Sequence, residues 1–441
     1  MSQADDIILP PSDNGQTPQQ WRKPTQLSEL DVPERLLEAL LLKHLQQSIE
    51  ANVIQLSDKL AIPGNLIEQI VRKLKTDALL EVKSQFGATS LTYTLTQKGR
   101  QIAQLELQRD GYLGPAPISL SLYRQLITHQ AQLKEELSPD TFSAALSDVI
   151  LSADTVNLLG PALNSGRAIF IYGLPGTGKT YISKRLIRLY NTPVYIPYAI
   201  YVNNQIIQVF DPILHHPVEQ QHNRLLLSDG NDTRLILCER PEVVVGGELT
   251  SDMLEISVDQ IRNINLAPLQ MKANNGILII DDLGRQRVSV DSILNRWIVP
   301  LEEKIDYLTL SSGEHFKIPF EQVLVFSSNI HPKKLADDAF LRRIGYKIEF
   351  KPVSSNDYKQ LWRAGCESHG LSIGPESIDY ITHTLHRRFD IPLLPCYPRD
   401  LSLMCKNQID FHRHPPTVTT ALIDSAWQSY FVDEINEHHK E

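Results

Sequence analysis

A glycine-rich stretch in the middle of the chain carries the residue types that hold a triphosphate. It consists of Gly173, Leu174, Pro175, Gly176, Thr177, Gly178, Lys179 and Thr180. Glycines let consecutive backbone N–H groups converge on one anion, while Lys179 can reach the β- and γ-phosphates and the Thr180 hydroxyl can hold Mg²⁺. An apolar run precedes this stretch and helical spacing follows it, which is the context that a phosphate-binding loop requires. The sequence therefore predicts a site for a nucleoside triphosphate.

A second apolar run, residues 277–280, ends in two carboxylates, Asp281 and Asp282. Such a run predicts a strand buried on both faces, and ligands of open α/β sheets bind at the carboxyl ends of these strands. Asp281 is placed to hold Mg²⁺ together with the loop threonine, and Asp282 to orient or polarise the attacking water. Another apolar run delivers Asn329 to the same edge, where its amide can hydrogen-bond the γ-phosphate and the water.

The elements that would position these residues follow from the apolar patterns between them. Residues 193–196 are expected to form the second core strand, and a hairpin at 199–210 and a β-rich piece at 235–245 to be inserted after it. A second hairpin is expected at 307–318. Helical spacing predicts a helix over 139–159, before the strand of the phosphate loop.

The N-terminal part has a different organisation. Residues 1–28 are rich in Pro, Gln, Ser and Asp without a period, which predicts a disordered tail. Residues 29–106 predict three helices followed by a β-hairpin, the order of a winged helix-turn-helix unit, with capping boxes at Asp31 and Asn65. Two functions fit this unit: reading DNA with its third helix, or docking a protein and scaffolding the chain itself. Its acidic and basic residues nearly balance, which favours docking.

Composition excludes several classes of protein. A formal charge of −9 argues against a surface that coats nucleic acid, and four cysteines without a C-x-x-C pair argue against a disulfide or zinc framework. The polar N-terminus is not that of a signal peptide, and no apolar run approaches the length of a membrane span. We expect a cytoplasmic protein without direct membrane insertion. His215, His216 and His222 lack supporting metal-ligand spacing and are expected on the surface.

The order of these features resembles that of the AAA+ ATPases. The shared features are the phosphate loop, the Asp–Asp strand, the strand-ending Asn329, the paired Arg342 and Arg343 before a final strand, and a helical C-terminal piece. The resemblance covers residues 140–441. The second hairpin is similar to that of the MoxR-like, helix-2-insert group. The combination of the N-terminal unit with the segments 267–274 and 339–343 makes the chain similar to bacterial ATPases with predicted chaperone activity.

The resemblance implies a fold class and its domains. We expect an α/β P-loop NTPase (AAA+) core with a parallel sheet at 140–350 and a C-terminal α-helical lid at 351–441. An N-terminal winged-helix-like α+β domain at 29–106 would be joined to this core by a connector and helix at 107–139.

The resemblance also implies roles and partners. Asn329 matches the sensor-1 position, and Arg399 matches the sensor-2 arginine of the lid. Arg343, with Arg342 as runner-up, matches the arginine finger that reaches the ATP of a neighbouring subunit. Family members use ATP and Mg²⁺ and work as rings, usually hexamers, that remodel a partner macromolecule. This implies a homo-oligomer with an unidentified protein client, and DNA as the alternative partner of residues 29–106.

One residue departs from the family pattern, because Asp282 stands where a glutamate is usual. A carboxylate one methylene shorter holds the attacking water less well, and about 1 Å of misplacement can cost on the order of 10²-fold in rate. The sequence therefore predicts a modest ATPase, and the resemblance implies that it remodels a protein. Two alternatives stay open: an ATP-switched DNA-binding regulator, and a nucleotide-binding structural protein without turnover.

Overall fold

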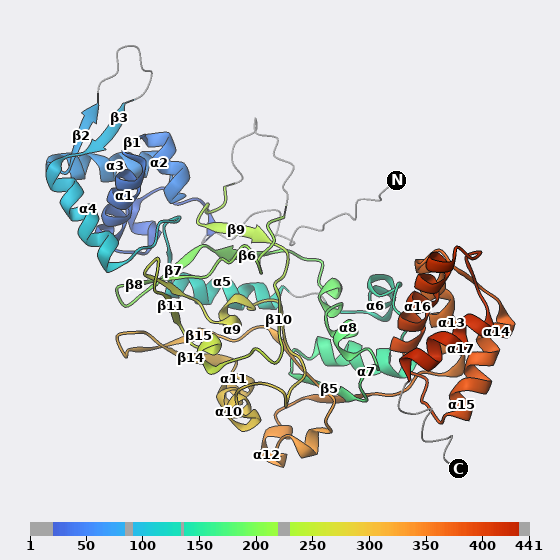
Figure 1. Ribbon diagram of the computed structural model, residues 1–441. Coiled ribbons are helices and arrows are strands. Elements are labelled where there is room, and N and C mark those ends of the chain that lie inside the picture. Colours follow the sequence, from blue (N-terminus) through green and yellow to red (C-terminus); the bar gives the residue numbers. More distant parts are fainter. Residues whose placement is uncertain (1–20, 84–90, 134–135, 219–229, 432–441) are drawn as a thin grey trace.

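The computed structural model describes residues 21–83, 91–133, 136–218 and 230–431. Figure 1 shows an N-terminal unit in blue, a central α/β region in green to orange, and a C-terminal helical unit in red. In the described part of the chain, no helix is long and apolar enough to cross a membrane.

The predicted disordered tail is ordered at its end. Residues 1–20 lie outside the described part. Trp21 is buried, and Leu27–Leu30 form a 3₁₀-helix. The Trp21 backbone carbonyl accepts a hydrogen bond from the Asp232 N–H at 2.8 Å, so this segment is fixed to a distant part of the chain.

The N-terminal unit consists of helices around a small antiparallel sheet of order β1-β3-β2. Its elements are α1 (Glu34–Ser48), β1 (Glu50–Asn52), α2 (Val53–Leu60), α3 (Gly64–Thr76), β2 (Leu80–Lys83), β3 (Thr92–Leu95) and α4 (Gln97–Arg109). Leucines and isoleucines at helical spacing on α1 and α3 are buried together, which holds the three helices on one core. Helices α1, α2 and α3 precede strands β2 and β3 in the predicted order, and β1 and α4 are additional to that prediction.

The predicted capping boxes do not form. Both α1 and α3 follow a proline, Pro33 and Pro63, and neither has a side-chain cap. Proline restricts φ to a value compatible with the start of a helix, so these helices begin without a side-chain cap. Asp31, the predicted cap, has a left-handed φ of 53° and lies before Pro33. The capping box of this unit lies at Asn52, whose side chain accepts from the Gln55 N–H at 2.9 Å.

The central sheet is parallel, with strand order β10-β13-β16-β5-β17. Its strands are β5 (Ile169–Gly173), β10 (Glu242–Val245), β13 (Ile277–Ile280), β16 (Val323–Ser328) and β17 (Tyr346–Phe350). All residues of β13 and β16 are buried, because hydrophobic clusters cover both faces of the sheet. Helix α7 (Ala153–Asn164) packs against β17, and α8 (Lys179–Ser183) packs against β5 and β16.

The second core strand was predicted at the wrong segment. Residues 193–196 contribute to β6 (Val194–Pro197), which pairs antiparallel with β9 (Leu235–Cys238) outside the central sheet. The second core strand is β10, parallel to β13 with Val245 opposite Ile280. Both runs are short and mostly apolar, so periodicity alone could not decide which would pair with β13.

A second five-stranded sheet joins the insertions to the connector, in the order β11-β12-β8-β7-β4. Its strands are β4 (Ile118–Ser119), β7 (Ala199–Val202), β8 (Gln205–Gln208), β11 (Ser257–Asp259) and β12 (Ile264–Leu266). Strands β7 and β8 are the predicted hairpin at 199–210. Ala199, Ile206 and Ile264 of this sheet belong to the same buried cluster as the N-terminal helices.

A buried ion pair also connects the N-terminal unit to this region. The Arg234 Nη2 and Asp232 Oδ2 atoms lie 2.7 Å apart, with side-chain exposures of 1% and 2%. Arg234 Nη1 donates to the Leu30 carbonyl at 2.8 Å and to the Pro117 carbonyl at 3.2 Å. Thr233 donates to the Ala61 carbonyl at 2.8 Å. The N-terminal unit is therefore packed onto the inserted strands.

The remaining elements flank the sheets or form the C-terminal unit. Flanking helices and strands are α5 (Leu120–Gln132), α6 (Pro139–Ala145), α9 (Leu269–Lys272), α10 (Val290–Arg296), α11 (Ile298–Glu303), β14 (Ile305–Thr309), β15 (His315–Pro319) and α12 (Asp338–Leu341). Residues 139–159 thus form α6 and the start of α7, not one helix. Strands β14 and β15 are the hairpin predicted at 307–318.

The C-terminal unit is mostly helical. It contains α13 (Ser355–Ser368), β18 (Ser372–Ile373), α14 (Pro375–Asp379), a π-helical segment (Tyr380–Leu385), α15 (His386–Arg388), α16 (Cys396–His412), β19 (Thr417–Val418) and α17 (Thr420–Tyr430). The predicted core and lid are confirmed: an α/β P-loop NTPase core with a parallel sheet is followed by a helical lid.

Candidate nucleotide site

The glycine-rich loop lies between β5 and α8, as its flanking sequence predicts. Gly176 and Gly178 have φ angles of +84° and +85°, which residues with a Cβ atom rarely adopt. Helix α8 has only five residues and is followed by a 3₁₀ turn at Leu186–Leu189, so the helix after the loop is shorter than its spacing suggested.

The loop lysine is held inside its own loop. Lys179 Nζ donates to the carbonyls of Gly173 and Leu174 at 3.0 and 2.8 Å, and its side chain is buried. Burial lowers the pKa of Lys179, and the negative charges of Asp282 and Asp281 oppose that shift. A buried ammonium bonded only to backbone carbonyls in the described structure suits the anionic phosphates that such a loop accommodates.

Thr180 and Asp281 meet although 101 residues separate them in the sequence. The Thr180 hydroxyl donates to Asp281 Oδ1 at 3.1 Å. Asp281 follows β13, and its backbone N–H donates to the Val245 carbonyl of the neighbouring strand at 2.7 Å. A hydroxyl and a carboxylate are the oxygen donors that Mg²⁺ takes from proteins beside a nucleotide, so this pair fits the predicted metal.

Asp282 and Asn329 also lie together. Asn329 Nδ2 donates to Asp282 Oδ1 at 3.2 Å. Asp282 has a left-handed φ of 49°, a conformation that aspartate tolerates better than most residues. Gln286 Nε2 donates to the carbonyls of Asp281 and Asp282 at 2.9 and 3.2 Å and so fixes the backbone of both carboxylates.

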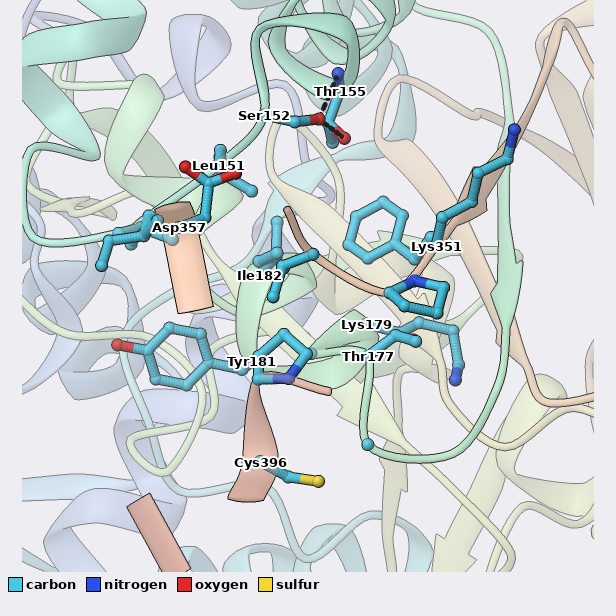
Figure 2. Close-up of a pocket in the computed structure, with 18 of the residues that line it drawn as sticks. Leu151, Ser152, Thr155, Thr177, Lys179, Tyr181, Ile182, Lys351, Asp357 and Cys396 are labelled. Carbon is cyan, nitrogen blue, oxygen red and sulfur yellow. Dashed lines mark hydrogen bonds between the residues drawn. The ribbon is translucent and has the colours of Figure 1, made fainter. Parts of the chain in front are cut away.

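Lys179, Thr180, Asp282 and Asn329 line a cavity of about 1290 Å³. Figure 2 shows side chains from three places around it: Leu151, Ser152 and Thr155 at the start of α7, Thr177 and Lys179 of the loop, and Cys396 of the lid. The α7 end of the cavity is partly apolar and the loop end is polar. This distribution matches a ligand with an uncharged planar end and an anionic end.

The lid reaches this cavity at the start of α16. The Cys396 N–H donates to the Gly176 carbonyl of the loop at 3.3 Å. Arg399, one turn further along α16, lines the cavity and is 69% exposed, with its Nε 3.1 Å from Asp400 Oδ1. The lid therefore delivers an exposed arginine to the cavity that holds Lys179.

The paired arginines lie elsewhere. Arg343 Nε is 2.7 Å from Glu302 Oε1, and its Nη1 donates to the Ala339 carbonyl at 2.8 Å. Arg342 is exposed and has no side-chain hydrogen bond or ion pair within the described ranges. Neither arginine is among the described residues that line the cavity of its own chain.

One carboxylate near the site was missed from the sequence. Glu248 follows β10, and its Oε1 accepts from the Gly246 N–H at 3.0 Å. This hydrogen bond lowers the pKa of Glu248, while the negative charge of Asp281 acts to raise it. The two carboxylates are therefore close enough to interact electrostatically. The signal was the Gly246-Gly247-Glu248 turn after a valine run, but only the pairing of β10 with β13 brings it to this edge.

His215 and His216, the described histidines of the insertion, do not form a metal site with other described residues. Among the described residues, no group of three or more His, Cys, Asp or Glu side chains could hold a metal ion. His216 is exposed, whereas His215 is fully buried, contrary to the surface position predicted for it. It accepts from the Asp211 N–H at 2.9 Å and bonds the Lys272 carbonyl at 2.9 Å. His222 lies outside the described residues.

Comparisons with known proteins add little about function. A family model described as a domain of unknown function, DUF8689, matches residues 354–429, which lie within the lid. No curated protein matches this chain. The chain is similar to solved structures of Thermotoga maritima RuvB: a single-residue mutant with 13% identity, TM-score 0.38, and coverage of 66% of this chain and 73% of that chain. A structure titled as the RuvB Holliday junction branch migration motor has 12% identity, TM-score 0.35, and coverage of 72% and 73%.

A third similar structure is NtrX from Brucella abortus, with 12% identity, TM-score 0.40, and coverage of 63% of this chain and 55% of that chain. The fold class stated above rests on the strand order and phosphate loop of this chain.

Proposed function

We propose that this chain is a Mg²⁺-dependent ATPase of the AAA+ type that assembles into a ring and remodels a protein partner. The observation that carries the ATPase proposal is the pair of contacts Thr180–Asp281 and Asp282–Asn329 at one edge of the sheet, beside the loop lysine. Metal-holding and water-holding groups that follow β13 and β16 thus lie beside one phosphate loop.

The residues divide the work of hydrolysis. The backbone N–H groups of the loop and Lys179 bind the phosphates, and Thr180 and Asp281 hold Mg²⁺. Bound Mg²⁺ supplies positive charge that neutralises the phosphates. Asp282 accepts a proton from the attacking water, and Asn329 fixes the carboxylate that does so.

The arginines support a shared site. Because Arg342 is exposed and lies outside the cavity of its own chain, it is available to a neighbouring copy, whereas Arg343 is paired with Glu302. We assign the arginine finger to Arg342 for this reason, in place of Arg343. Arg399 would contact the γ-phosphate from the lid of the same chain, where it lines the cavity.

The N-terminal unit is better suited to protein contacts than to DNA. On α3, Lys73 Nζ lies 3.1 Å from Glu34 and 2.6 Å from Glu38, and Arg72 lies 3.5 Å from Glu68. These carboxylates reduce the positive potential that would attract phosphates. The N-terminal unit shares a hydrophobic core with the inserted strands, which supports its role as a scaffold that presents a client-binding surface. In this proposal residues 29–106 form the docking domain, 140–350 the nucleotide-binding domain and 351–441 the lid.

The test is steady-state ATP hydrolysis by the full chain, with and without Mg²⁺. Lys179→Ala is expected to abolish the Mg²⁺-dependent turnover, and Lys75→Ala, an exposed lysine on α3, serves as the matched control. Turnover that survives in Lys179→Ala would refute the proposed site. A full chain that binds duplex DNA with a steep salt dependence, lost in Lys75→Ala, would instead support the regulator.

A further inference from the structure

Lys347, on the edge strand β17, joins the wall of the nucleotide cavity to the segment that carries the paired arginines. Its Nζ donates to the Leu341 carbonyl at 2.7 Å and to the Ile344 carbonyl at 2.8 Å. The same lysine is among the residues that line the cavity. The division of work proposed above for ATP hydrolysis gives this side chain no role.

The two hydrogen bonds of Lys347 lie on either side of the arginines. Leu341 ends α12, and Ile344 lies three residues beyond it. Arg342 and Arg343 are the two residues between the bonded carbonyls. A lysine that bonds the last carbonyls of a helix often only stabilises the helix end. Here the second carbonyl lies outside the helix, beyond both arginines, so the two bonds define the path of the chain through them.

The arginine segment is held at a further point by Arg343. Its Nε lies 2.7 Å from Glu302 Oε1 of α11, and its Nη1 donates to the Ala339 carbonyl at 2.8 Å. Arg342, in contrast, is exposed and has no side-chain hydrogen bond or ion pair within the described residues. The segment is therefore fixed around one arginine that has no contact of its own. This arrangement suits a side chain that contacts another molecule.

Strand β17, which carries Lys347, is fixed to the phosphate loop. It pairs in parallel with β5, from Tyr346 opposite Ile169 to Phe350 opposite Gly173. Gly173 begins the loop, and a Cβ atom on it would lie 2.2 Å from the Phe350 carbonyl. Because packed protein interiors transmit small shifts instead of absorbing them, the backbone of Lys347 has a defined position relative to the loop.

We propose that Lys347 is a positioning residue that places Arg342 of one copy for contact with the nucleotide of the next copy. The inference rests on the proposed function, because it takes the ring and the finger at Arg342 from it. Lys347 holds the chain on both sides of Arg342, and β17 connects this lysine to the phosphate loop of the same copy. The geometry of the finger that a copy offers is thereby linked to its own nucleotide site.

The test is ATP turnover and ATP binding by full-chain Lys347→Met, alone and mixed with Lys179→Ala. About 1 Å of misplacement costs on the order of 10²-fold in rate, so turnover of Lys347→Met alone should fall by about that factor. Its Kd for ATP should be unchanged. Mixing should restore turnover, because Lys179→Ala subunits supply a correctly held Arg342 to the intact sites of Lys347→Met subunits.

Two further variants separate positioning from a general effect on stability. Lys347→Arg can still donate to both carbonyls and should retain most of the turnover. Lys98→Met is the matched control, because exposed Lys98 also donates to a backbone carbonyl at a helix end, that of Asp77 at 3.1 Å. This bond lies in the N-terminal unit, so turnover of Lys98→Met should equal that of the wild type.

Three results would overturn the proposal, and they differ in what else they overturn. Wild-type turnover in Lys347→Met would show that Arg342 needs no such support. Turnover that mixing restores for Arg342→Ala but not for Lys347→Met would place the effect of Lys347 in its own subunit and leave the finger intact. An Arg342→Ala that mixing does not restore would refute the finger itself, and the inference with it. Should Lys347→Met fail to bind ATP, Lys347→Gln gives the same comparison with a polar side chain.

Discussion

Replacing Asp282 with asparagine tests the assigned chemistry with little change of structure. Asparagine has the same shape, its Oδ1 can still accept the Asn329 Nδ2 hydrogen bond at 3.2 Å, and it tolerates the left-handed φ of 49°. The substitution removes only the negative charge and the ability to take a proton. We therefore expect the fold and the cavity to be retained in Asp282→Asn.

The expected loss is that of a general base. Positioned bases contribute about 10²- to 10⁴-fold, so kcat should fall by that factor. ATP affinity should be unchanged or tighter, because one negative charge beside the phosphates is lost while Lys179 stays in place. A drop in kcat without a weaker Kd is the signature of a group that acts on the attacking water and not on binding.

The assay is single-turnover hydrolysis with ATP binding measured in parallel, using exposed Asp252→Asn as the control. A kcat within about threefold of the wild type in Asp282→Asn would refute the role of Asp282 as the base, since that is far below the range for base removal. Glu248→Gln then gives the decisive comparison. If it loses turnover where Asp282→Asn does not, Glu248 is the base that activates the water.

Three further predictions concern the interface, the fold and the lid. Arg342→Ala should lower turnover by about 10³-fold or more, and mixing it with Lys179→Ala subunits should restore turnover. Arg343→Ala should lower turnover less. Equal effects of the two substitutions would contradict the assignment of the arginine finger to Arg342. Arg234→Met, which leaves a buried carboxylate unpaired, should destabilise the chain by about 3–5 kcal/mol in urea unfolding, and a loss below about 1 kcal/mol would refute the buried clamp. Burial lowers the pKa of His386 to about 4, so between about pH 6.5 and pH 4 the unfolded chain binds a proton that the folded chain does not. The free energy of unfolding should therefore decrease as the pH is lowered through this range. His386→Gln should flatten that slope; an unchanged slope would contradict the assignment.

The features that could be predicted from the sequence are those fixed by short-range constraints. The phosphate loop needs glycines at set positions between a strand and a helix. The continuous apolar run before Asp281 suits a strand that is buried on both faces, as in a parallel sheet. The hairpin predicted at 307–318 forms as β14 (Ile305–Thr309) and β15 (His315–Pro319). Parallel strands bring their carboxyl ends to one edge, so Asp282 and Asn329 were expected together before any contact was seen.

Features that depend on pairing between distant segments could not be predicted in this way. The choice of β10 over β6 as a core strand depends on which run reaches β13, and both runs have similar composition. Glu248 lies near the site only because β10, the strand that precedes it, pairs with β13. Likewise, nothing local in Arg342 and Arg343 distinguishes them; the difference is that Arg343 pairs with Glu302, which lies on α11.

Gly176 shows how one residue can satisfy two constraints of which the sequence reveals only one. The loop requires its left-handed φ of 84°, and that requirement follows from the motif. The lid imposes the other, because a Cβ atom on Gly176 would lie 2.5 Å from Cys396 Sγ. The Cys396 N–H also donates to the carbonyl of this same glycine. The phosphate loop and the first turn of α16, which also carries Arg399, are therefore in direct contact through Gly176.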